Sequence, residues 1–86
     1  MPTLLRLRGL RFMFYSNDHR PAHVHVLGGG SEAVFVMNCK DTPPHGTPEL
    51  RENYGFSNGE LNVIEHDITE NLDHFCSEWG AIHGDY

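Results

Sequence analysis

The chain has 86 residues, six Lys and Arg against twelve Asp and Glu, and a formal net charge of −6. A chain of this length can build one thin core, so we expect residues 1–86 to form a single domain that gains stability from a partner or as a homodimer. It has no apolar run long enough to span a membrane and no signal-peptide pattern, so we expect a cytoplasmic protein that does not contact membranes. Cys39 and Cys76 lack CxxC spacing and are expected to be reduced, unpaired thiols.

The first half of the chain predicts two β-hairpins within residues 4–37. Apolar and polar residues alternate over 4–8 and 10–15 around Arg8-Gly9, where glycine can reach positive φ. A second pair of strands, 23–27 and 32–37, is joined by the glycines at 28–30, which favour a plain turn because no Lys-Ser/Thr follows them. Residues 38–56 are rich in Pro and Gly and are expected to form a loop.

The second half predicts one helix over residues 57–80, followed by a tail at 81–86. Ser57-Asn58-Gly59-Glu60 has the form of a capping box. An apolar stripe then recurs at three- and four-residue steps up to Gly80, comprising Leu61, Ile64, Ile68, Leu72, Phe75 and Trp79. The expected fold class is therefore α+β, a small antiparallel sheet of two hairpins (four strands) with one C-terminal amphipathic helix packed on one face.

Such a sheet leaves its second face uncovered. Strand alternation places several basic, aromatic and imidazole groups there, namely Arg6, Arg8, Arg11, Met13, Tyr15, His23 and His25. Basic and aromatic groups suit phosphate contact and base stacking, whereas Arg and Tyr also mark protein contacts. The candidate binding residues are Arg6, Arg8, Arg11, Tyr15, Asn17 and Asp18. Five of the six basic residues lie in residues 1–40, which permits a local anion-binding surface despite the negative net charge.

The run from Ser16 to Val26 concentrates three histidines, an arginine and an acid, and histidine can both transfer protons near neutrality and bind metals. Three interpretations stay open. The first is RNA cleavage without a metal, with one histidine as base, another as acid and an arginine stabilising the phosphorane; its candidate catalytic residues are His19, Arg20, His23 and His25.

The second interpretation is a metal site on His23 and His25, completed by His19 or Asp18, which the neighbouring charge of Arg20 disfavours. The third is structural, with the histidine-bearing face covered by a partner chain. We expect no cofactor and no metal at this motif.

The segment MPTLLRLRGLRFMFYSNDHRPAHVHVLGGGSEAVFVMN, with GFSNGEL and the helix end at Trp79-Gly80, resembles the bacterial domain-of-unknown-function family 4160. Its specific part is residues 15–26, and the family motif falls on Asn17, Asp18, His19, Arg20, Pro21, His23 and His25. Members of that family are small cytoplasmic proteins often encoded beside a small protein of family 2442, in what looks like a toxin–antitoxin arrangement.

The resemblance implies the toxin component of a type II pair, with a small antitoxin-like protein as its partner and RNA or translation as a candidate target. The alternative is a non-catalytic module whose open sheet face binds a small partner protein or a second copy of itself.

Overall fold

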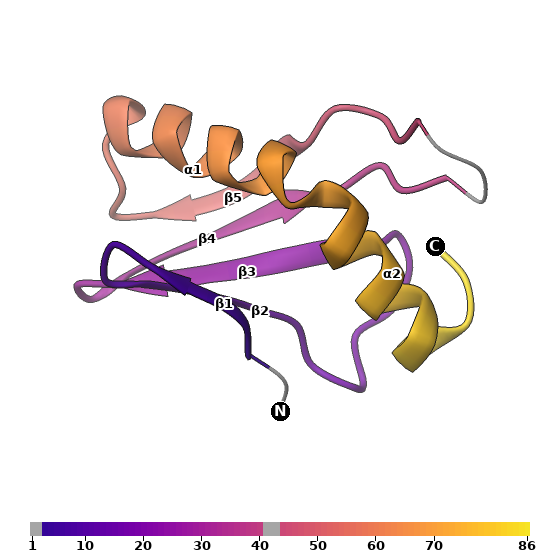
Figure 1. Ribbon diagram of the computed structural model, residues 1–86. Coiled ribbons are helices and arrows are strands. Elements are labelled where there is room, and N and C mark those ends of the chain that lie inside the picture. The colour runs from indigo at the N-terminus through magenta and orange to yellow at the C-terminus, as the bar shows by residue number, and fades with distance from the viewer. Residues whose placement is uncertain (1–2, 41–43) are drawn as a thin grey trace.

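A five-stranded antiparallel sheet and two helices make up the part of the chain that the structure, a computed structural model, describes, which is residues 3–40 and 44–86. The strands lie side by side in chain order: β1 (Thr3–Leu7), β2 (Leu10–Met13), β3 (His23–Gly28), β4 (Ser31–Val36) and β5 (Glu49–Tyr54). Helix α1 (Asn58–Glu70) lies over the sheet, and α2 (Leu72–His83) continues past the end at which β3 begins (Figure 1). The predicted α+β class is confirmed.

The core lies where alternate strand side chains meet the apolar stripe of the helices. Its large members are Phe12, Val24, Val26 and Phe35 from the sheet, Phe14 and Met37 directly after β2 and β4, and Ile64, Ile68, Leu72, Phe75 and Trp79 from the helices. Burial of one such side chain contributes roughly 1.5–3 kcal/mol relative to its exposure. The predicted helix stripe is confirmed, with Leu61 only partly buried at its start.

The local turn and cap signals are also confirmed. Arg8 and Gly9 in the β1–β2 turn have positive φ, as do the two glycines at 29–30 in the β3–β4 turn. At the start of α1, the Glu60 N–H donates to Ser57 Oγ and the Ser57 N–H donates to the Glu60 carboxylate. This capping box satisfies two amides that the first helical turn would otherwise leave free.

Strand β5 lies inside the segment that was predicted to be a loop, so the prediction of a four-stranded sheet is wrong by one strand. The strand pairs antiparallel with β4 at the edge of the sheet, and five of its six residues are exposed. An edge strand needs no alternating apolar pattern, and ELRENY has none. The nearest proline, Pro48, directly precedes the strand and leaves its hydrogen-bonding groups intact. Residues 41–43 of the predicted loop lie outside the described residues.

The predicted single helix over 57–80 is two helices that meet at Asn71. The Asn71 side-chain amide donates to the Asp67 carbonyl at 2.9 Å, and its φ of −114° and ψ of 15° lie outside the helical range. Asparagine side chains compete in this way for backbone carbonyls, which interrupts the helix. The second helix passes Gly80 and ends at His83, where Gly84 adopts positive φ. The prediction of a helix end at Gly80 is therefore wrong.

The two cysteines form a disulfide, which corrects the expectation of unpaired thiols. Cys39 follows β4 and Cys76 lies in α2, and the bond joins residues 37 positions apart. Spacing rules could not indicate this pair, because the chain reversal that brings the two residues together depends on the whole sheet. The disulfide ties the second helix to the sheet end at which β3 begins.

Candidate functional site

The loop between β2 and β3 brings Asp18 to the two histidines of β3. The Tyr15 N–H donates to Asp18 Oδ2 at 2.9 Å, and the Asp18 N–H donates to the Tyr15 carbonyl at 3.1 Å. These two bonds close a tight turn and fix the position of the carboxylate. Asp18 Oδ2 then lies 3.5 Å from His23 Nε2 and 3.3 Å from His25 Nε2.

These three side chains, which we name the Asp-His cluster (Asp18, His23 and His25), are largely shielded from solvent. Their exposed side-chain fractions are 14%, 5% and 13%. One oxygen of Asp18 and one nitrogen from each histidine all lie within 4.8 Å of one another. The arrangement offers three metal-ligand atoms to one point.

Aromatic rings hold both imidazoles of the cluster in place. The His23 ring lies 5.2 Å from the Trp79 indole, and the His25 ring meets the Tyr15 ring edge to face at 4.9 Å. His23 Nδ1 is 2.8 Å from the Pro21 carbonyl, which can only accept a hydrogen bond. Trp79, which packs against His23, lies 56 residues away and could not be placed there from the sequence.

His25 presents its other nitrogen to a second carboxylate. His25 Nδ1 lies 3.6 Å from Glu32 Oε2, which is beyond hydrogen-bond distance. His25 Nδ1 is buried and has no hydrogen-bond partner among residues 3–40 and 44–86. The cross-strand register of β3 and β4 brings Glu32 close, a contact that the strand pairing explains but that the histidine motif did not indicate.

The other motif residues do not join the cluster. His19 is exposed and is not one of the grouped ligand residues. Arg20 is exposed, and its guanidinium lies 3.6 Å from Asp85 near the C-terminus. Asn17 is exposed as well. The RNA-cleavage interpretation requires His19 and Arg20 beside His23 and His25. The structure does not bring these four residues together.

The predicted arginines divide between the two sides of the sheet. Arg6 and Arg11 are cross-strand partners on the face without helices, as predicted. Arg8, at the turn, instead forms an ion pair with Asp67 of α1, whose side chain is only 6% exposed. The expectation that Arg8 lies on the uncovered face is therefore wrong, because the positive φ at residues 8 and 9 takes the chain out of the strand alternation.

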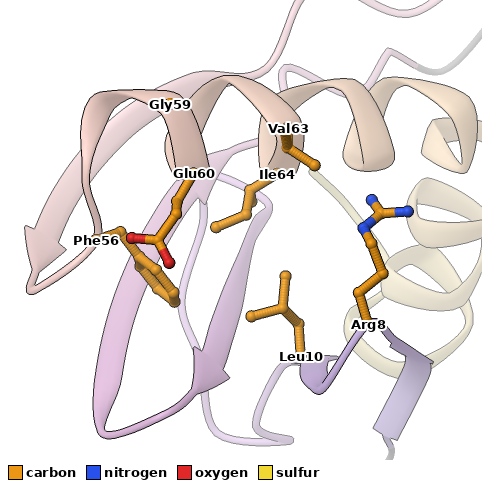
Figure 2. A pocket seen from close by; sticks show the side chains of 7 residues that line it. All are labelled: Arg8, Leu10, Phe56, Gly59, Glu60, Val63 and Ile64. Atoms are coloured by element: carbon orange, nitrogen blue, oxygen red, sulfur yellow. The ribbon is translucent and has the colours of Figure 1, made fainter.

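A pocket of about 330 Å³ lies between the β1–β2 turn and the start of α1. Figure 2 shows the side chains of Leu10, Phe56 and Ile64 pointing toward one another, with Glu60 and Arg8 on opposite sides. We name this the hairpin pocket; it is lined by Arg8, Leu10, Phe56, Gly59, Glu60, Val63 and Ile64. No sequence pattern predicts this pocket, since its lining comes from two segments about 50 positions apart that only the packed fold brings together.

The fold and these two sites define a small α+β protein with one closed polar cluster and one open apolar pocket. The family model described as Domain of unknown function (DUF4160) matches residues 9–80. The chain belongs to this family, which confirms the resemblance drawn from its motif. No curated protein and no solved structure matches the chain significantly. Within the described residues, no helix is long and apolar enough to cross a membrane.

Proposed function

We propose that this protein is a binding module, the toxin-like member of a two-protein bacterial system, and that it binds its partner at the hairpin pocket. The observation that carries the proposal is the pocket itself, whose volume of about 330 Å³ suits one bulky apolar side chain. Val63 at its wall is 47% exposed. Exposed apolar groups around a concave site are typical of binding surfaces.

The charges around the hairpin pocket indicate an acidic partner segment. Arg6 and Arg11 lie on the face without helices and line a second hollow of the hairpin together with Arg8, and residues 3–17 contain no acid at all. Among the described residues, Glu60 is the one acid that lines the hairpin pocket itself. Arg8 is half exposed even though it pairs with Asp67, so part of its charge still faces solvent. We therefore infer a partner segment with a large apolar anchor flanked by Asp or Glu. Complementary charge of this kind mainly accelerates association and excludes wrong partners.

The geometry of the Asp-His cluster supports binding over RNA cleavage. Cleavage of the kind considered needs an acid, a base and a cation that the substrate can reach. His23 is 5% exposed and both of its nitrogens face protein atoms, while Arg20 is directed to Asp85. The antitoxin-like partner and the cytoplasmic location remain inferences from the family resemblance, and we include both in this proposal.

The experiment compares two variants that place the same charge on two exposed apolar helical residues. Val63→Glu puts a carboxylate into the hairpin pocket, whereas Ile82→Glu places one on α2, where Ile82 is 39% exposed and lines no part of the pocket. Each variant is purified and titrated by calorimetry against a small protein of family 2442, the antitoxin-like partner that the family resemblance implies. We expect Val63→Glu to weaken binding roughly 100-fold, because it removes one apolar anchor contact and adds a like-charge clash. Ile82→Glu should bind like the unaltered chain.

The same variants are expressed in a bacterial host, with growth and total RNA integrity followed together. Growth arrest with intact RNA that co-expression of the antitoxin-like partner relieves for the unaltered chain, but not for Val63→Glu, would support a binding mechanism. Equal binding by Val63→Glu and the unaltered chain would refute the site. Cleaved RNA that disappears in a folded His23→Ala/His25→Ala variant would instead favour the catalytic alternative.

A further inference from the structure

The Asp-His cluster has the spacing of a tetrahedral metal site. Ligand bonds to Zn²⁺ are about 2.0–2.2 Å, so two ligand atoms of a tetrahedral site lie about 3.3–3.5 Å apart. Asp18 Oδ2 lies 3.3 Å from His25 Nε2 and 3.5 Å from His23 Nε2. Two of the three edges of the cluster thus match such a site without any movement of the side chains.

The hydrogen bond of His23 sets the tautomer that metal binding requires. Because the Pro21 carbonyl accepts only, His23 Nδ1 carries a proton, and in the neutral imidazole the lone pair of Nε2 faces Asp18. A backbone carbonyl in this position is the outer-shell partner commonly found behind metal-bound histidines. The carboxylate of Asp18 and the imidazole of His23 therefore present acceptors to each other.

Neither neutral tautomer of His25 supplies hydrogen-bond donors to all of the acceptors around it. With its proton on Nε2, it donates to Asp18, but its bare Nδ1 is buried against the Glu32 carboxylate at 3.6 Å. With its proton on Nδ1, it faces Glu32 favourably, but three acceptors then converge between Asp18, His23 and His25. A cation at that point satisfies all three acceptors and leaves Nδ1–H directed to Glu32.

We propose that the Asp-His cluster binds one divalent transition-metal ion, with Zn²⁺ the best fit. Two imidazoles and one carboxylate form a borderline donor set that suits Zn²⁺ better than Mg²⁺ or Ca²⁺, and a water completes four-coordination. The position of Arg20 in the sequence disfavoured a dication at this motif. In the structure, Arg20 is paired with Asp85 instead. The metal joins the β2–β3 loop to β3, and this site is independent of the hairpin pocket.

The test titrates the full, tag-free chain with ZnCl₂ by calorimetry, after a thiol assay has shown that both cysteines are in the disulfide. We expect one equivalent of Zn²⁺ to bind. Asp18→Asn, which keeps the shape of the side chain, and His25→Ala should each weaken binding roughly 100-fold or more, above the 10–100-fold range for outer-shell changes. The matched control is His66→Ala, which removes an exposed histidine paired with Glu70 at 3.0 Å and should change affinity less than twofold.

Imidazole ¹⁵N NMR of the same samples identifies the ligand atoms directly. Zn²⁺ should shift the Nε2 signals of His23 and His25 while both Nδ1 atoms keep their protons. The proposal fails if Zn²⁺ does not bind, if His66→Ala removes the binding, or if the spectra show His25 with two protons that Zn²⁺ does not displace. Circular dichroism of Asp18→Asn separates a loss of the ligand from a loss of the fold.

Discussion

The two ends of strands β2 and β3 differ in almost every physical respect. At one end, where β3 begins, the Asp-His cluster is polar, closed by Tyr15 and Trp79, and its side chains are at most 14% exposed. At the other end, beside the β1–β2 turn, the hairpin pocket is apolar, open and bordered by charge. Helix α2 passes the first end and α1 begins near the second (Figure 1).

A concentration of chemically versatile residues therefore need not mark the surface that meets a large partner. The histidine motif is the most distinctive run in the sequence, yet its reactive atoms face one another and admit only something small. The hairpin pocket is built from common residues such as Leu10 and Val63, but it offers the accessible apolar surface that association needs. We assign the ion to the first end and the protein partner to the second.

Removal of the disulfide that holds α2 against the closed end should cost the most stability. The bond spans 37 positions, and loop entropy gives it about 4 kcal/mol of stabilisation. A Cys39→Ser/Cys76→Ala double variant should lose about that much unfolding free energy in urea titrations. It should also lose Zn²⁺ affinity, while the affinity for the partner at the hairpin pocket stays within threefold. Equal losses of affinity for Zn²⁺ and for the partner would show that the two sites are not independent. Reductant added to the unaltered chain provides the matched control.

The second effect concerns the ion pair that anchors the turn at the open end. Arg8→Ala leaves the carboxylate of Asp67, only 6% exposed, without its cation. We expect a loss of about 2 kcal/mol, less than the ~3–5 kcal/mol of a fully buried pair because Arg8 is half exposed. Thermal and urea unfolding measure the loss.

Two further variants control the Arg8 prediction. Arg8→Met/Asp67→Leu, which removes both charges, should restore most of the stability, because the cost comes from an unpaired carboxylate. Arg11→Ala on the uncovered face should cost less than about 0.5 kcal/mol. If Arg8→Ala lowers Zn²⁺ affinity as much as it lowers stability, the two ends are coupled and the comparison fails.

The parts of this structure that could be predicted are those that depend on near neighbours in the chain. The turn at Gly9, the capping box at Ser57 and the helix stripe all follow from local chemistry, and all are present. Strand β5 has no local signal, since its stability comes from pairing with β4. The interruption of the helix at Asn71 could be suspected from the residue type. However, the apolar stripe continues from Ile68 to Leu72 across Asn71, which favoured a single helix.

The candidate sites divide in the same way. His23 and His25 share a face because of strand alternation, and Asp18 is five positions away, so their proximity was foreseeable. Their isolation from Arg20 was not, because the ion pair with Asp85 depends on the path of α2 and the C-terminus. The pocket required the contact of the hairpin with α1, which no local pattern specifies.

A smaller effect is expected from the cap of α1, whose first turn contributes Gly59 and Glu60 to the pocket. Ser57→Ala removes the side-chain oxygen that accepts the Glu60 N–H at 3.2 Å. We expect a loss of about 1 kcal/mol of unfolding free energy and weaker partner binding. Zn²⁺ affinity should be unchanged. Ser57→Asp, which keeps the cap, should behave like the unaltered chain in both titrations, whereas a loss of metal binding in Ser57→Ala would contradict the separation of the ends.

A small change is expected in the pKa of Tyr54, which is the cross-strand partner of Glu32 at the open end of the sheet. The hydrogen bond of its hydroxyl to Glu52, and then the charges of Glu52 and Glu32, raise the pKa of Tyr54 above its ordinary value of 10.0. The protonated phenol is therefore the form that the fold favours, so its contribution is fully present below pH 10.0 and is lost as the pH rises through the folded-state pKa. Glu52→Gln should lower the pKa of Tyr54 most and Glu32→Gln less, as followed by NMR of ¹³C-labelled tyrosine. His25→Ala should leave the pKa of Tyr54 unchanged; a shift in that variant would mean that Glu32, which faces both groups, transmits the state of the closed end to the open one.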